Sequence, residues 1–140
     1  MRKGPLRFLL PGQQTNRENA SLLGRENGMK ATINGKTFGV TLENNEAAAA
    51  FAALLPMELA MSELNGNEKY HYLMGLLPSR PERVGHVEAG DLMLFGNDCV
   101  VLFYKGFKTG YSYTRIGRLN DASGVASAVG RGSVTIKFVD

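Results

Sequence analysis

The sequence predicts a mostly β fold, in which a closed antiparallel β-barrel is accompanied by two short helices. Three observations lead to this fold class. The segment 90–107 contains two strongly apolar strands separated by a short turn. Other strand-like segments flank it on both sides, without a repeated strand–helix–strand unit. Only two segments, near residues 46–55 and 121–129, have the composition of short helices.

The central hairpin is the clearest of these features. Asp91–Phe95 and Cys99–Tyr104 are rich in residues that favour strands, and Gly96–Asp98 between them has the composition of a turn. Neither strand alternates apolar with polar residues, so both faces of the hairpin are apolar and both must be covered. Helices or other sheet could provide that cover, and a closed barrel with helices packed on it would do so too.

The remaining strands are expected on both sides of this hairpin. Asn34-Gly35 is a strong hairpin signal, because both residues tolerate positive φ. Ser133–Val139 alternates cleanly, with Val134, Ile136 and Phe138 facing inward. The expected strands are, in order, Ala31–Ile33, Lys36–Leu42, Met57–Met61, Tyr70–Leu73, Tyr111–Leu119 and Ser133–Val139.

Two short helices and three connections complete the prediction. Asn44 or Asn45 caps the first helix and Pro56 ends it, with an apolar face that includes Phe51, Leu54 and Leu55. The second lies within Asn120–Val129 and ends at Gly130. The polar segment Ser62–Lys69 is expected to be a loop or a hairpin tip. The other expected loops are the proline-containing and exposed connection Leu76–Glu88, and Gly106–Gly110.

A chain of 140 residues is expected to form one domain with a single core. Its formal net charge is +3, but the first 30 residues contain six Lys and Arg against two Glu, so the rest is slightly acidic. We therefore expect no nucleic-acid binding. Residues 1–28 show no periodicity and are expected to be a flexible N-terminal extension, or to precede a translation start at Met29, with the domain spanning 29–140. With no signal peptide or membrane span, we expect a cytoplasmic protein.

The sequence contains no motif for a metal or cofactor, and we expect neither. His71 and His86 are the only histidines, and they lack the spacing of a metal site. Cys99, the single cysteine, lies within an apolar strand and is expected to be a buried, inert thiol.

The order of these elements resembles the cyclophilin fold, and more closely the small prokaryotic cyclophilin-like proteins, whose function is mostly undefined. The resemblance covers residues 31–140 and is carried by ATINGKTFGVTLENNEAAAAFAALLP, SELNGNEKYHYL, GDLMLFGNDCVVLFYKGF and SVTIKFVD. It implies a cyclophilin-like barrel. The catalytic strand of prolyl isomerases carries Phe-His-Arg, whereas the nearest match here is Tyr70-His71-Tyr72, so Tyr72 stands where the arginine would be.

The resemblance also implies a ligand groove on an outer face of the barrel. By position, this groove would include Met61, Tyr72, Phe103 and Tyr113. Each of these residues also fits an alternative in which it belongs to the core or is half-buried. Polar loop residues and one arginine complete the candidate ligand-binding set, which is Met61, Glu63, Asn65, Tyr72, Phe103, Tyr113 and Arg118.

Arg115 and Arg118 are the candidates for a substitute arginine. They lie three residues apart, which places them on opposite faces of a regular strand. Three functional hypotheses follow. The first is a binding module for a peptide or small-molecule ligand with little or no prolyl isomerase activity. The alternative is a peptidyl-prolyl cis-trans isomerase that uses a substitute arginine. The third is an accessory protein that acts through a protein partner.

Overall fold

The computed structural model describes residues 28–140. The predicted N-terminal extension, up to residue 27, lies outside the described residues. No helix in the described range is long and apolar enough to cross a membrane.

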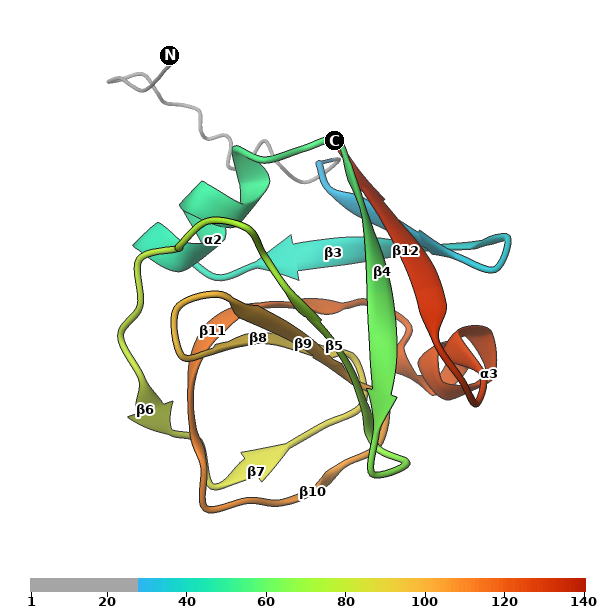
Figure 1. The fold of residues 1–140 in the computed structure, drawn as a ribbon. Helices are drawn as coiled ribbons and strands as arrows, with labels where there is room; N and C mark the ends of the chain where they lie inside the picture. Colours follow the sequence, from blue (N-terminus) through green and yellow to red (C-terminus); the bar gives the residue numbers. More distant parts are fainter. Residues whose placement is uncertain (1–27) are drawn as a thin grey trace.

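Eight strands of the described chain form a closed antiparallel barrel, which confirms the predicted fold class (Figure 1). The order around the barrel is β3-β2-β12-β4-β5-β9-β8-β11, and β11 returns to pair with β3. The strands are β2 (Lys30–Ile33), β3 (Lys36–Leu42), β4 (Met57–Leu64), β5 (Glu68–Tyr72), β8 (Asp91–Phe95), β9 (Cys99–Phe103), β11 (Ser112–Leu119) and β12 (Val134–Val139).

The main core fills the barrel because alternate residues of each strand point inward. In β12, the predicted inward residues Val134, Ile136 and Phe138 are buried, whereas Thr135 and Lys137 are exposed. Every residue of β9 is buried. At about 25 cal/mol per Å² of apolar surface, this burial is the main favourable contribution to folding.

The central hairpin is buried on both faces, as the sequence predicts. Leu92 and Leu102 belong to the core inside the barrel, whereas Met93 and Phe103 belong to a second apolar cluster outside it. This outer cluster also contains Val87, Cys99, Val101 and Tyr113.

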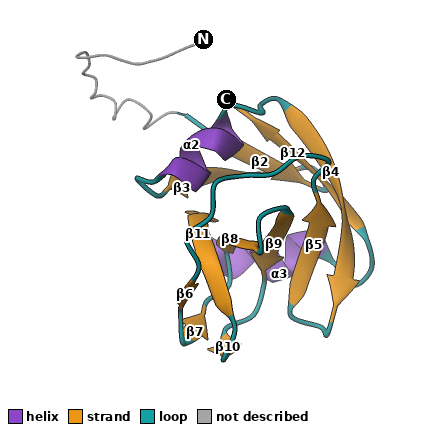
Figure 2. Ribbon diagram, turned by 60° about the vertical axis from the view of Figure 1, so that its left-hand side comes forward, coloured by secondary structure: helices purple, strands orange, loops and turns teal. Residues whose placement is uncertain are grey.

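Of the two kinds of cover expected for this hairpin, helices or other sheet, the structure has the second, because short strands and their loops cover the outer cluster. Three short strands, β6 (Glu82–Arg83), β7 (His86–Val87) and β10 (Phe107–Lys108), lie beside β11 (Figures 1 and 2). β7 pairs with β10, and β6 pairs with β11. The segment Leu76–Glu88 is therefore not a simple exposed connection, because Leu77 and Val87 are buried.

The two helical segments of the described residues are short, and each supplies apolar side chains to the core. α2 (Glu46–Ala52) begins at Asn45, whose Oδ1 accepts a hydrogen bond from the Ala48 N–H at 2.8 Å. Phe51 packs edge-on against Phe138. Leu54 was expected on the apolar face of this helix, but it lies beyond the last turn and is 46% exposed.

The second helical segment consists of a 3₁₀ turn, η3 (Ala122–Gly124), followed by α3 (Val125–Val129). Val125 and Val129 of α3 are buried in the barrel core. Figure 1 shows α3 on the opposite side of the barrel from α2.

The polar segment Ser62–Lys69 was expected to be a loop or a hairpin tip, and it contains the tip of the hairpin that β4 and β5 form. Only the turn at residues 65–67 separates the two strands, and Asn65 and Gly66 have positive φ there. The two strands extend further than the polar composition indicates, because polar side chains can occupy a barrel strand without breaking its hydrogen-bond ladder.

Candidate functional site

The strand alternation of β5 produces one distinctive outer surface. Glu68, Tyr70 and Tyr72 occupy alternate positions and therefore share a face. They pair in register with Phe103, Val101 and Cys99 of β9, which face outward in the second cluster. The outer faces of β5 and β9 thus form a mixed floor of aromatic, apolar and acidic side chains.

This floor belongs to a cavity of about 400 Å³, which we call the aromatic groove. The turn between β4 and β5 contributes to one wall, and residues from β8, β10, β11 and the loop before β11 contribute to the others. Its lining residues are Leu64, Asn65, Asn67, Glu68, Tyr70, Tyr72, Phe95, Cys99, Val101, Phe107, Tyr111 and Tyr113.

The aromatic rings of the groove contact one another at steep angles. Tyr70 and Tyr72 have ring centroids 6.0 Å apart and planes at 80°. Phe95 meets Tyr111 at 6.0 Å and 86°. Such edge-to-face pairs are the preferred geometry of aromatic contacts, and they hold the walls in place.

Phe103 supports the groove from below. It does not line the cavity, but its ring lies 5.4 Å from that of Tyr113 and 5.7 Å from that of Phe107. The groove is therefore attached to the fully buried hairpin at the centre of the fold.

Glu68 is the one charged residue among the lining residues, all of which are described. Desolvation raises the pKa of its carboxyl group, and the neighbouring Glu63 carboxylate raises it further. The pKa of Tyr113 is also raised, mainly by burial and then by the charge of Glu68. The groove thus combines an apolar lining with negative potential.

Cys99 lies on the floor of the groove, and its thiol is poorly suited to nucleophilic chemistry. Burial raises its pKa to about 11, and the nearby Asp98 carboxylate adds to the effect. A protonated thiol is a weak nucleophile and a weak metal ligand. Among residues 28–140, no group of three or more His, Cys, Asp or Glu side chains is placed to hold a metal ion.

Three residues that the sequence identified as candidates meet in the groove. Asn65, Tyr72 and Tyr113 line it, although they come from a turn and two strands that are not neighbours in the sheet. Phe103 lies beneath them. Met61 is fully buried in the barrel core, on the inner face of β4, and so is remote from this outer surface.

Glu63 does not line the groove, because it holds a buried lysine instead. Its Oε1 accepts hydrogen bonds from Lys69 Nζ and Tyr104 Oη, both at 2.8 Å. Its Oε2 accepts the Gly66 N–H at 2.6 Å. Lys69 is 0% exposed and also donates to two backbone carbonyls, those of Gly130 at 2.9 Å and Gly132 at 2.6 Å. We call this set the Lys69 network.

The two candidate substitute arginines, Arg115 and Arg118, also lie outside the groove lining. They were expected on opposite faces of β11, but the pairing with β8 skips Ile116. Because of this bulge, the side chains of Arg115 and Arg118 lie on the same face of β11. Arg115 is opposite Met93, and Arg118 is opposite Asp91. The local signal for this bulge is Gly117, because a glycine inside a strand is typical of a bulge or of close backbone approach, and a side chain here would meet the backbone of Thr41.

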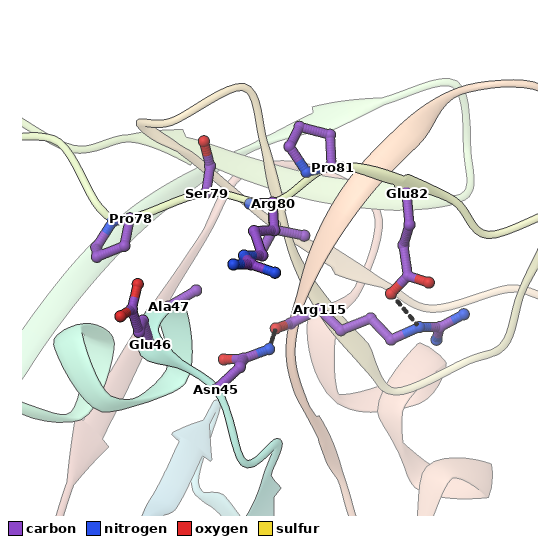
Figure 3. Close-up of a pocket in the computed structure, with 10 residues that line it drawn as sticks. Asn45, Glu46, Ala47, Pro78, Ser79, Arg80, Pro81, Glu82 and Arg115 are labelled. Atoms are coloured by element: carbon purple, nitrogen blue, oxygen red, sulfur yellow. Dashed lines mark hydrogen bonds and ion pairs between the residues drawn. The ribbon is translucent and has the colours of Figure 1, made fainter.

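Arg115 belongs instead to a second cavity of about 570 Å³, which we call the arginine pocket (Figure 3). Its Nε lies 3.4 Å from Glu82 Oε2, and its backbone carbonyl accepts a hydrogen bond from Asn45. Arg80 is fixed at the edge of this pocket by the hydrogen bond from its backbone N–H to Thr114 Oγ1, at 2.9 Å.

The sequence did not predict the arginine pocket. Its lining residues come from the start of α2, the 78–82 segment and β11, which are far apart in the chain. The only local signal is the pair Pro78 and Pro81, which indicates an exposed connection rather than a pocket.

Comparison with known proteins agrees with the observed barrel. A family model described as the cyclophilin-like family matches residues 31–139. A search of curated proteins finds no match. The matched segment covers every strand of the barrel except the first residue of β2. With this match over nearly all of the described residues, the chain belongs to the cyclophilin-like family.

Proposed function

We propose that this domain is a binding module that holds a peptide or a small ligand in the aromatic groove, with little or no prolyl isomerase activity. The observation that carries the proposal is the groove itself, a cavity of about 400 Å³ in which six of the twelve lining residues are aromatic and one, Glu68, is charged. Ligand sites in proteins are commonly of about 300–1,000 Å³ with this kind of lining.

The chemistry of the groove also argues for weak catalysis. Prolyl isomerisation must cross a barrier of roughly 18–20 kcal/mol, and catalysis requires interactions that strengthen as the amide bond twists. The family resemblance implies a guanidinium donor at the position of Tyr72. A phenol offers one O–H, whereas an arginine offers a fork of donors.

The alternative, isomerisation with a substitute arginine, needs a guanidinium beside Phe103. No lysine or arginine occurs among the groove's lining residues, which all fall in the described range. Arg115 is instead near Glu82 in the arginine pocket, and Arg118 is exposed and pairs in register with Asp91.

Binding is tested by titrating ¹⁵N-labelled full-length protein with an Ala-Ala-Pro-Phe peptide and a set of small fragments, followed by NMR. We expect at least one probe to shift groove resonances saturably. Tyr111→Ala should weaken that binding, because Tyr111 is a 65% exposed wall residue whose loss leaves the core intact. Leu54→Ala is the matched control, an exposed apolar residue outside the groove lining. Saturable shifts confined to the arginine pocket, or none with any probe, would refute the proposal.

Catalysis is tested by a coupled isomerase assay on the same full-length protein. We expect activity far below that of a true cyclophilin, and a gain in Tyr72→Arg if this position corresponds to the catalytic arginine. Robust activity in the unmodified protein, lost in Arg115→Ala or Arg118→Ala, would establish the alternative.

A further inference from the structure

We propose that the aromatic groove selects a small organic cation, a substituted ammonium group on an apolar body. This inference rests on the proposed function, since it names the class of ligand that the same groove takes. It is carried by three features of the groove: its aromatic walls, its unpaired acceptors and its lack of basic residues.

The walls provide π faces on several sides. Six of the lining residues are aromatic, namely Tyr70, Tyr72, Phe95, Phe107, Tyr111 and Tyr113. Because Tyr70 and Tyr72 are perpendicular, as are Phe95 and Tyr111, the rings do not all face one way. A cation within about 6 Å of an aromatic face is attracted by the ring quadrupole, and several such faces form a cage for quaternary ammonium groups.

The acceptors provide complementary charge. Glu68 is half-buried, and within residues 28–140 no hydrogen bond or ion pair to its carboxylate is found. Asn67, which also lines the groove, has a buried Oδ1 without a hydrogen-bond partner in the described structure. A half-buried carboxylate without a counter-charge is unfavourable, and a cationic ligand would supply that charge.

The neighbouring lysine does not neutralise Glu68. Lys69 is adjacent in sequence but points to the opposite face of β5, where Glu63 and two carbonyls hold its ammonium group. The raised pKa of Glu68 agrees with this, because an adjacent cation would lower it.

The proposal commits to a small molecule rather than to a side chain of a partner protein. The groove volume of about 400 Å³ lies within the range of small-molecule sites. Residues 31–140 are nearly neutral in net charge. They therefore create no strong negative potential that would attract a large basic partner protein.

The test compares choline with 3,3-dimethylbutan-1-ol, a neutral molecule of almost the same shape. Both are titrated into ¹⁵N-labelled full-length protein, and the dissociation constants are taken from groove resonances such as those of Tyr70 and Val101. We expect choline to bind at least about tenfold more tightly, which corresponds to about 1.4 kcal/mol.

Two variants distinguish the contribution of the Glu68 charge to choline binding from that of the aromatic rings. Glu68→Gln should weaken choline binding about tenfold and leave the neutral probe within about twofold, since it removes charge but little volume. Tyr72→Leu should have the same selective effect, because leucine keeps apolar area without a π face. Glu58→Gln, an exposed carboxylate on β4, is the control and should change neither probe.

Each contrary result overturns a defined part of the account. Equal binding of choline and the neutral probe in the groove would refute the cation preference and leave the binding function standing. Tighter binding of a Gly-Lys-Gly peptide than of choline would show that the partner is a peptide, against the small-molecule proposal. If no probe, including the neutral fragments, shifts groove resonances, both the cation preference and the proposed function are wrong.

Discussion

Replacement of Glu63 by glutamine should strongly destabilise the fold, because it removes the counter-ion of a fully buried lysine. Lys69 is 0% exposed, and its ammonium group has three oxygen partners at 2.6–2.9 Å, of which Glu63 is the only anion. Removing one partner of a buried ion pair typically costs about 3–5 kcal/mol. Domains of this size are stable by only about 5–15 kcal/mol, so the loss should be plain in a urea titration followed by circular dichroism.

Two further variants test the reasoning. Lys69→Met removes the buried charge and leaves Glu63 partly accessible to water, so it should cost less than Glu63→Gln. In the double variant the losses should not add, because the residues contact each other. Glu58→Gln, on the exposed side of the same strand, should stay within about 0.5 kcal/mol of the unmodified protein. A loss below about 1 kcal/mol for Glu63→Gln would refute the structural role of the network.

The effect of Glu63→Gln on stability should depend on pH, and the pKa of Glu63 sets the direction. Burial raises the pKa of Glu63, but hydrogen bonds from Lys69, Tyr104 and Gly66 outweigh it, so the folded-state pKa lies below the ordinary 4.5. A lowered carboxyl pKa contributes stability that is complete above the unfolded-state value and is lost as pH falls through the folded-state value. The unmodified protein and Glu63→Gln should therefore differ most near neutral pH and converge in acid.

The remaining predictions concern the groove and the hairpin. Glu68→Gln should raise the melting temperature at pH 7 but not in acid, because the raised pKa of Glu68 means that its charged form is unfavourable in the folded state. Lower stability at pH 7 would contradict this. Leu102→Ala and Phe103→Ala, one on each face of the central hairpin, should each cost roughly 2–5 kcal/mol in urea unfolding. A loss below about 1 kcal/mol at either site would contradict two-sided burial.

The barrel was predictable because its strongest signals are local and periodic. Asn34-Gly35 predicts its hairpin turn, and the alternation of Val134, Ile136 and Phe138 predicts which face is buried. The central hairpin is apolar on both faces, so the sequence also predicts that its outer face is covered. The nature of the outer cover was not predictable, because β7 and β10 have only two residues each.

The candidate site was only partly predictable, for a reason of geometry. The resemblance placed Tyr72 and Tyr113 on the relevant face, and they line the groove. It also placed Met61 there, but the alternation of β4 directs this residue into the core. Asn67 and Glu68 belong to a polar segment whose side chains fit either ligand contacts or a solvated hairpin loop. The sequence does not decide between the two, because nothing local shows that the turn between β4 and β5 faces aromatic rings from β8 and β11.

The most direct test of the central claim is a measurement of where a ligand contacts the protein. Intermolecular nuclear Overhauser effects can be recorded between a bound probe and two methyl reporters, Val101 on the floor of the aromatic groove and Ala47 in the arginine pocket. The account predicts contacts to Val101 and to the rings of Tyr70 and Tyr113, with none to Ala47. Contacts to Ala47 alone would contradict it and would place the binding function in the arginine pocket.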